Sequence, residues 1–204
     1  MSKYGHRTHN WFEAVINKIG GEEAAERFLR GELTISESMS PWVESDGVIY
    51  FTVTSDGKSG PEWIAHLEKK GDRVGDYAKK LLYHRNSRFT NGVTYQVAVI
   101  KGMVYNDRDR TTKNIRKDAD SRKLSKPNAE IACLIRDKFT DAEIVTMGIE
   151  AIIAMHEPIK DSDGYLRLLG AGRDQSVRWL DSYYARPDFQ WSPRNGFAFV
   201  VSQV

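Results

Sequence analysis

The chain has 204 residues, of which 40% are hydrophobic and 28% are charged, and its formal net charge is only +2. This apolar content excludes an intrinsically disordered protein, and the near-neutral charge excludes attraction of nucleic acid or anionic membranes over the whole surface. No apolar run approaches the roughly 18 residues that a bilayer span needs, and the N-terminus has no apolar stretch of signal-peptide length. We therefore expect a cytoplasmic protein that makes no membrane contact.

Two short helices are predicted near the N-terminus. Residues 10–19 have apolar side chains at helical spacing, and Asn10 with Glu13 forms a capping-box pattern at their start. Glycines at positions 20 and 21 end this helix, because glycine commonly terminates helices. A second helix is expected from Glu22 to Arg30, so residues 1–40 form a predicted helical hairpin.

Two strands are predicted in the segment that follows. Residues 47–56 and 93–100 alternate side chains in the two-residue period of a strand. The predicted helices of this segment begin at Ser59, at Asp72 and at Ser125.

A further short helix is expected after Thr140, because Thr140 and Glu143 form a capping box and Gly148 closes the segment. After Gly148 the helical period is lost. Four short strands are expected instead, at residues 149–156, 165–169, 178–184 and 196–201, separated by turns rich in Pro, Asp and Gly.

These elements predict an α+β protein in three segments. Residues 1–40 form the helical hairpin, residues 41–148 a mixed α/β scaffold, and residues 149–204 a β-rich region that carries the candidate binding surface. Residues 149–204 are either a domain of their own or part of one domain with residues 41–148.

The sequence contains no convincing catalytic, metal or cofactor motif. His156-Glu157-Pro158 lacks the second histidine of a zinc helix, and its proline would break that helix. The single cysteine, Cys133, lies in an apolar run, so we expect a buried side chain rather than a nucleophile. We predict no cofactor and no metal. An enzyme would need a cleft that gathers residues such as His156, Glu157 and Asp163.

Aromatic and polar residues are concentrated near the C-terminus. Rigid rings beside short polar groups are typical of recognition surfaces, although a β-rich core with polar loops explains the pattern equally well. The candidate binding residues are Arg173, Asp174, Gln175, Ser176, Tyr183, Arg186, Asp188, Phe189, Trp191, Arg194 and Asn195.

A basic segment at residues 107–126 is the candidate for nucleic-acid binding. A turn at residues 121–127 between short helices gives it a loose helix-turn-helix outline, but interleaved acids favour a solvated, ion-paired helix. Its candidate residues are Arg108, Arg110, Lys113, Arg116, Lys117, Arg122 and Lys123.

Two resemblances involve particular segments of the chain. The C-terminal part of the chain resembles the end of C-type-lectin-like domains, through the segments Leu168–Asp174, Trp179–Tyr184 and Trp191 through Phe199. The most similar branch contains the formylglycine-generating-enzyme fold and the variable proteins of diversity-generating retroelements. The resemblance implies a diversified binding surface above a closing Gly-Phe strand. The chain lacks the cysteine pair and the Glu-Pro-Asn calcium loop, so calcium-dependent sugar binding is not implied, and neither is the enzyme's cysteine chemistry. Separately, most of the chain resembles uncharacterised small proteins of candidate-phylum bacteria, which implies no activity. The segments that carry this second resemblance are Arg27–Leu33, Lys126–Cys133 and Met155–Lys160.

Two functions are therefore expected from the sequence. The first is a non-enzymatic protein that binds a protein or other macromolecule through the C-terminal surface. The alternative is a nucleic-acid-binding or regulatory protein that uses the basic segment.

Overall fold

The computed structural model describes residues 8–33, 40–174 and 177–201. The chain divides into two compact units, residues 1–40 and residues 41–204, which we call unit 1 and unit 2. Among the described residues no helix is both long and apolar enough to cross a membrane. Two of the predicted binding residues, Gln175 and Ser176, lie outside the described residues, as does the side chain of Asp174.

Unit 1 contains α1 (His9–Ile19) and α2 (Glu22–Leu29), joined by glycines at positions 20 and 21 with positive φ angles. Neither helix buries a residue. The first helix is capped by Thr8 without a side-chain hydrogen bond, so the predicted capping box of Asn10 and Glu13 is wrong. The helix begins too early for Asn10 to lie at its cap.

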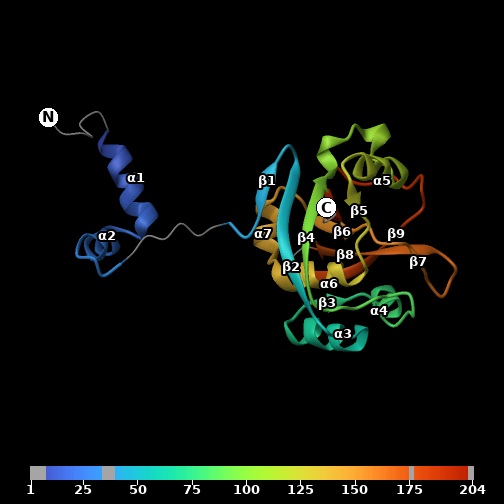
Figure 1. Cartoon of the computed structure of the whole chain (residues 1–204). Helices are drawn as coiled ribbons and strands as arrows, with labels where there is room; N and C mark the ends of the chain where they lie inside the picture. Colours follow the sequence, from blue (N-terminus) through green and yellow to red (C-terminus); the bar gives the residue numbers. More distant parts are fainter. Residues whose placement is uncertain (1–7, 34–39, 175–176, 202–204) are drawn as a thin grey trace. The chain divides into compact units, whose positions relative to one another are not determined.

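Unit 2 is built on a mixed sheet, which confirms the predicted α+β class (Figure 1). All neighbouring strands of the described sheet are antiparallel except β6 with β10 and β3 with β9. The strand order is β1 (Val43–Ser45), β2 (Val48–Asp56), β4 (Asn91–Lys101), β10 (Asn195–Val201), β6 (Ala151–Ala154), β8 (Leu166–Asp174), β9 (Val177–Tyr184) and β3 (Arg73–Val74), while β5 (Leu124–Ser125) pairs with β10 and β7 (Ile159–Lys160) with β8.

The C-terminal strands are part of the same sheet as the earlier ones. Strand β10 lies between β4 and β6, where Phe197 is opposite Ile100 on one side and Ile153 on the other. The described strands between residues 149 and 201 therefore share one sheet and its cores with the strands of residues 41–148.

The two faces of the sheet bury separate hydrophobic clusters because successive side chains point to opposite faces. One cluster includes Ile49, Val99 and Leu169, and the residues from helices belong to α3 (Gly60–Lys69), α4 (Asp76–Leu82), α6 (Glu130–Lys138) and α7 (Asp141–Thr146). The other includes Val48 and Phe197 and lies under α5 (Thr112–Ser121). Cys133 is fully buried in the first cluster, and burial raises the pKa of its thiol, so it is not an accessible nucleophile.

Two helices begin later than the sequence predicts. Helix α4 begins at Asp76 rather than Asp72, because the buried Asp72 carboxylate forms an ion pair with Arg178 and the next two residues form β3. Helix α6 begins at Glu130 rather than Ser125, because Leu124 and Ser125 pair with β10. The capping boxes at Ser59 and Thr140 are confirmed.

Strand directions decide which loops meet at each end of the sheet. Strands β6, β9 and β10 finish at the same end where β4 and β8 begin, and we call it the β6 end. Strands β8 and β9 join at the opposite end, which we call the hairpin end. Strand β9 has eight residues, so the two ends are roughly 26 Å apart along it.

Candidate functional site

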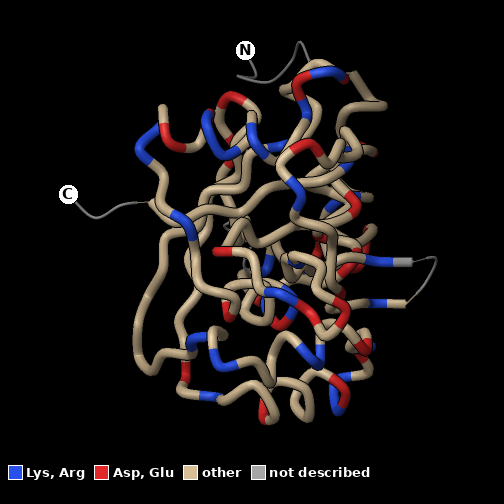
Figure 2. Tube along the Cα trace, turned by 90° about the vertical axis from the view of Figure 1, so that its right-hand side faces the viewer, with Lys and Arg blue, Asp and Glu red and all other residues tan. Residues whose placement is uncertain are grey.

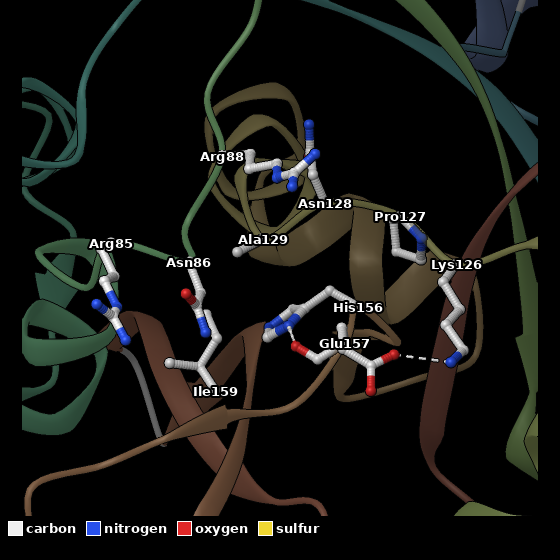
Figure 3. Close-up of a pocket in the computed structure, with 10 residues that line it drawn as sticks. All are labelled: Arg85, Asn86, Arg88, Lys126, Pro127, Asn128, Ala129, His156, Glu157 and Ile159. Carbon is white, nitrogen blue, oxygen red and sulfur yellow. Dashed lines mark hydrogen bonds and ion pairs between the residues drawn. The ribbon is translucent and has the colours of Figure 1, made fainter.

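A hollow of about 450 Å³ lies at the β6 end of the sheet (Figure 3). Three segments line it: the loop after α4, the residues before α6 and the residues after β6. We call it the arginine hollow. Its lining residues are Arg85, Asn86, Arg88, Lys126, Pro127, Asn128, Ala129, His156, Glu157 and Ile159.

Positive charge dominates the arginine hollow. Arg85 and Arg88 are exposed, and neither forms an ion pair or hydrogen bond through its side chain with any residue in the described part of the chain. Lys126 forms an ion pair with Glu157 at 2.7 Å between Nζ and Oε2. The one acid of the lining is thus paired, and the guanidinium groups of Arg85 and Arg88 have no partner among the residues that the structure describes.

His156 forms a neutral, buried part of this hollow. Its Nδ1 donates to the Glu157 carbonyl oxygen at 2.7 Å, and its Nε2 accepts from the Leu169 amide at 3.0 Å. Burial lowers the His156 pKa to about 4. Both ring nitrogens are occupied, so the imidazole is not free to act as a base or a metal ligand.

No group of three or more His, Cys, Asp or Glu side chains in the described part of the chain could hold a metal ion. A catalytic cleft would have to gather His156, Glu157 and Asp163, but Asp163 does not line the arginine hollow with the other two. Asp163 instead accepts a hydrogen bond from Tyr77 Oη at 2.6 Å.

A second hollow of about 380 Å³, which we call the lysine hollow, lies beside α5. Ile115 and Ala119 point into the core, so Lys113 and Lys117 lie exposed on the hollow's edge, one helical turn apart. Neither lysine has an ion-pair partner in the described part of the chain. Arg116 also lines the hollow, but its guanidinium donates to the carbonyl oxygens of Met155 at 3.0 Å and His156 at 2.7 Å.

A third hollow of about 300 Å³ is lined by Tyr165, Tyr184 and Arg186, and we call it the tyrosine hollow. The two rings meet edge to face with centroids 5.8 Å apart and are 53% and 39% exposed. Arg167 lies 4.0 Å from the centroid of the Tyr184 ring and binds Asp161 at 2.8 Å. These contacts hold one ring in place and leave the other open to solvent.

The three hollows lie around the β6 end. The Lys126–Glu157 ion pair lines both the arginine and the lysine hollow. Leu166, Ala185 and Pro187 of the lysine hollow are chain neighbours of the residues that line the tyrosine hollow. Together we call them the β6-end surface. Seven basic and two acidic residues line it, whereas Figure 2 shows basic and acidic residues mixed along the trace.

The predicted C-terminal binding residues do not form one surface. Arg186, Asp188 and Phe189 follow β9 at the β6 end, where the backbone of Phe189 accepts a hydrogen bond from Thr112. Arg173, Arg194 and Asn195 lie at the hairpin end, and Arg194 forms an ion pair with Glu150. The sheet separates the two groups.

Trp191 was predicted to lie on the binding surface, but the structure buries it. It is only 4% exposed, and its Nε1 donates to Thr112 Oγ1 at 2.9 Å. Its ring packs on Phe189 and Phe197, so it belongs to the core beneath α5. Tyr183 is partly buried against the same cluster, and burial raises its pKa to about 12.

Arg110 was predicted to contact nucleic acid, but the structure buries it. Its side chain is buried and donates to the carbonyl oxygens of Gly102, Tyr105 and Trp191. Of the other residues predicted for nucleic acid, Lys113, Arg116 and Lys117 line the lysine hollow, whereas Arg108, Arg122 and Lys123 do not. Arg122 forms an ion pair with Asp118 at 3.0 Å.

Sequence reasoning missed Arg85, Arg88 and Tyr165. The run His84-Arg85-Asn86-Ser87-Arg88 is a basic, polar loop and could have suggested an anion site. Nothing in the sequence places it beside residues 126–129 and 156–159.

No protein-family model, curated protein or solved structure matches this chain. Function is therefore inferred from the geometry of the β6-end surface.

Proposed function

We propose that the protein binds single-stranded nucleic acid on the β6-end surface. The observation that carries the proposal is the excess of basic residues, seven against two acidic ones, beside the exposed rings of Tyr165 and Tyr184. Proteins that bind single strands combine a positively charged groove for the phosphates with aromatic side chains on which bases stack. The surface supplies both.

A single strand suits this surface better than a duplex. Duplex readers commonly place a helix in the major groove, but α5 is followed by β5 rather than by a second helix, so the expected helix-turn-helix outline is absent here. Arg116 on α5 is also committed to backbone carbonyl groups. A flexible strand can instead follow hollows that lie around the end of the sheet.

Binding of a protein partner through the C-terminal surface stays a prediction. Its residues are divided between the two ends of the sheet and Trp191 is buried, which weakens the case for one shared surface. The resemblance to C-type-lectin-like domains also stays a prediction.

The proposal is tested by measuring affinity for a fluorescent oligo-dT and an oligo-U over a salt series. Replacing Lys113 and Lys117 together with Ala should reduce the steepness of the log–log salt dependence by about 1.4, because each phosphate that a lysine neutralises on a single strand contributes about 0.7. Lys69→Ala is the matched control, because Lys69 is exposed on α3 and lines none of the three hollows. The proposal would be contradicted if the affinity did not depend on salt. It would also be contradicted if Lys69→Ala reduced the salt dependence as much as the double change at Lys113 and Lys117.

Stacking is tested in the same assay with Tyr165. The Tyr165→Ala protein should bind about fivefold or more weakly, because base–aromatic stacking contributes about 1–3 kcal/mol per base. Tyr165→Phe keeps the ring and should bind like the parent protein. If Tyr165→Ala binds the oligonucleotides as tightly as Tyr165→Phe and the parent protein do, no base stacks on Tyr165.

A further inference from the structure

The arginine hollow differs from the rest of the β6-end surface in the kind of cation it presents. Arg85 and Arg88 reach it from one loop and Lys126 from another segment, and Figure 3 shows the three side chains at separate positions around the hollow. A guanidinium group has five N–H donors in a planar fork that can bind two oxygens of one phosphate. The lysine hollow offers mainly ammonium groups, which act as point charges.

The charge of the arginine hollow suits a phosphate at the end of a strand. An internal phosphodiester carries a single negative charge, whereas a phosphomonoester carries roughly −1.5 to −2 at pH 7 and has three acceptor oxygens. Glu157 is neutralised by Lys126, and Arg85 and Arg88 have no acidic partner in the described part of the chain. Two free guanidinium groups therefore match a dianion better than a diester.

The position of the arginine hollow suits the end of a bound strand better than its middle, because the hollow adjoins only one of the other two. It shares two lining residues, Lys126 and Glu157, with the lysine hollow and none with the tyrosine hollow. The buried residues Ala129, His156 and Ile159 also line it. His156 has a pKa of about 4, so it adds no positive charge near pH 7.

We infer that the arginine hollow binds the terminal phosphomonoester of a nucleic-acid strand whose remaining nucleotides lie on the lysine and tyrosine hollows. This inference depends on the proposed function. The terminal phosphate is held by Arg85 and Arg88, and the adjoining phosphates are attracted by Lys113 and Lys117.

The test compares three oligonucleotides of one sequence, with a 5′-phosphate, with a 3′-phosphate, or with hydroxyl groups at both ends. One phosphorylated form should bind about tenfold more tightly than the hydroxyl form, because a charge-assisted pair with arginine is among the stronger hydrogen-bonded contacts. The form that gains affinity identifies which strand end enters the hollow. Equal affinity for all three would overturn the inference while leaving the proposed function intact, whereas no binding to any of them would overturn both.

Variants assign the effect to the hollow. Replacing Arg85 and Arg88 with Ala should abolish the preference for the phosphorylated end and change affinity for the hydroxyl form much less. Arg88→Lys keeps the charge but loses the fork, and should retain only part of the preference. Arg173→Ala is the control, since Arg173 is exposed at the hairpin end. A preference that survives the double change, in a protein with an unaltered circular-dichroism spectrum, would also overturn the inference.

Discussion

Buried polar side chains connect helices to strands that are distant from them in the sequence. Arg136 on α6 is fully buried, and its guanidinium donates to the carbonyl oxygens of Phe139 and Gly172 and pairs with Asp141 at 3.0 Å. Asp72 pairs with Arg178 at 2.7 Å on the same face. Removing one partner of such a pair leaves an uncompensated buried charge, so these residues fix how α6 and α7 lie on β8 and β9.

His156 should make the stability of the protein depend on pH. In the folded protein its pKa is about 4, against an ordinary value of 6.5. As the pH falls below 6.5, the unfolded chain takes up a proton that the folded chain refuses until about pH 4. The free energy of unfolding should therefore fall by about 3 kcal/mol in total across this window, with the full stability present above pH 6.5.

The measurement is urea unfolding of the parent protein and of His156→Gln between pH 7 and pH 3.5. The variant should be less stable at pH 7, because it loses two buried hydrogen bonds, but it should lose about 3 kcal/mol less on acidification. His9→Gln is the control, since His9 is exposed in unit 1. Parallel pH profiles for the parent and His156→Gln would show that the imidazole is not held neutral.

Burial at the residue scale could be predicted only in part. The apolar run around Cys133 indicated a buried thiol, and it is buried. Trp191 and Arg110 have polar sequence neighbours, yet both are buried, because the distant Thr112 accepts from the Trp191 ring and the distant Trp191 carbonyl oxygen accepts from the Arg110 guanidinium. Such partners cannot be identified from spacing along the chain.

Two helix starts, those of α3 and α7, are specified by local chemistry at the scale of elements. In α7 the Thr140 hydroxyl accepts from the Glu143 amide at 3.3 Å, while the Glu143 carboxylate accepts from the Thr140 amide at 2.7 Å. These contacts satisfy amide groups that otherwise lack partners in the first turn. Both caps that were predicted correctly are of this kind, at Ser59 and at Thr140.

Thr140→Ala should lower the free energy of unfolding by about 1 kcal/mol, which is the usual cost of losing a capping side chain. Thr146→Ala is a matched control, because Thr146 is exposed at the other end of α7 and its hydroxyl donates to the Ala142 carbonyl oxygen instead of capping the first turn. Chemical denaturation of both variants compares them directly. An equal loss of stability in the two would mean that the bonds at Thr140 do not stabilise α7.

The starts of α4 and α6 needed tertiary information. The sequence offers candidate helix starts at Asp72 and Ser125, but Arg73 and Val74 pair with β9, while Leu124 and Ser125 pair with β10. Strand pairing satisfies the backbone groups that a longer helix would have used. A local sequence pattern contains no information about the strand that supplies those bonds.

The whole molecule combines two units with different degrees of burial. Helices α1 and α2 bury none of their residues, whereas unit 2 has extensive hydrophobic clusters on both faces of its sheet. Both hydrophobic clusters consist of residues from unit 2, so we expect the stability of unit 2 to be independent of residues 1–40. We expect that residues 149–204 do not fold alone, because β10 pairs with β4, which lies outside that segment, as well as with β6.

A protein lacking residues 1–40 should fold and unfold cooperatively, with a melting temperature within about 2–4 °C of the full chain, the change that 1 kcal/mol produces in a domain of this size. Differential scanning calorimetry of both proteins provides the comparison. A fragment of residues 149–204 should show no cooperative transition. Collapse of the truncated protein, or cooperative unfolding of the small fragment, would contradict this division of the chain.

The sequence by itself determined the α+β class, most of the helices and longer strands, and two helix caps, because periodicity, glycine positions and capping residues act over a few neighbouring residues. Only the tertiary structure decided that β10 lies between β4 and β6, that the predicted C-terminal surface is divided between two ends of the sheet, and that Arg85, Arg88, Lys113 and Tyr165 gather at one of them. The physical reason is that strand order and direction are set by long-range pairing and by burial on both faces of the sheet, which bring together residues whose separation in the chain carries no signal.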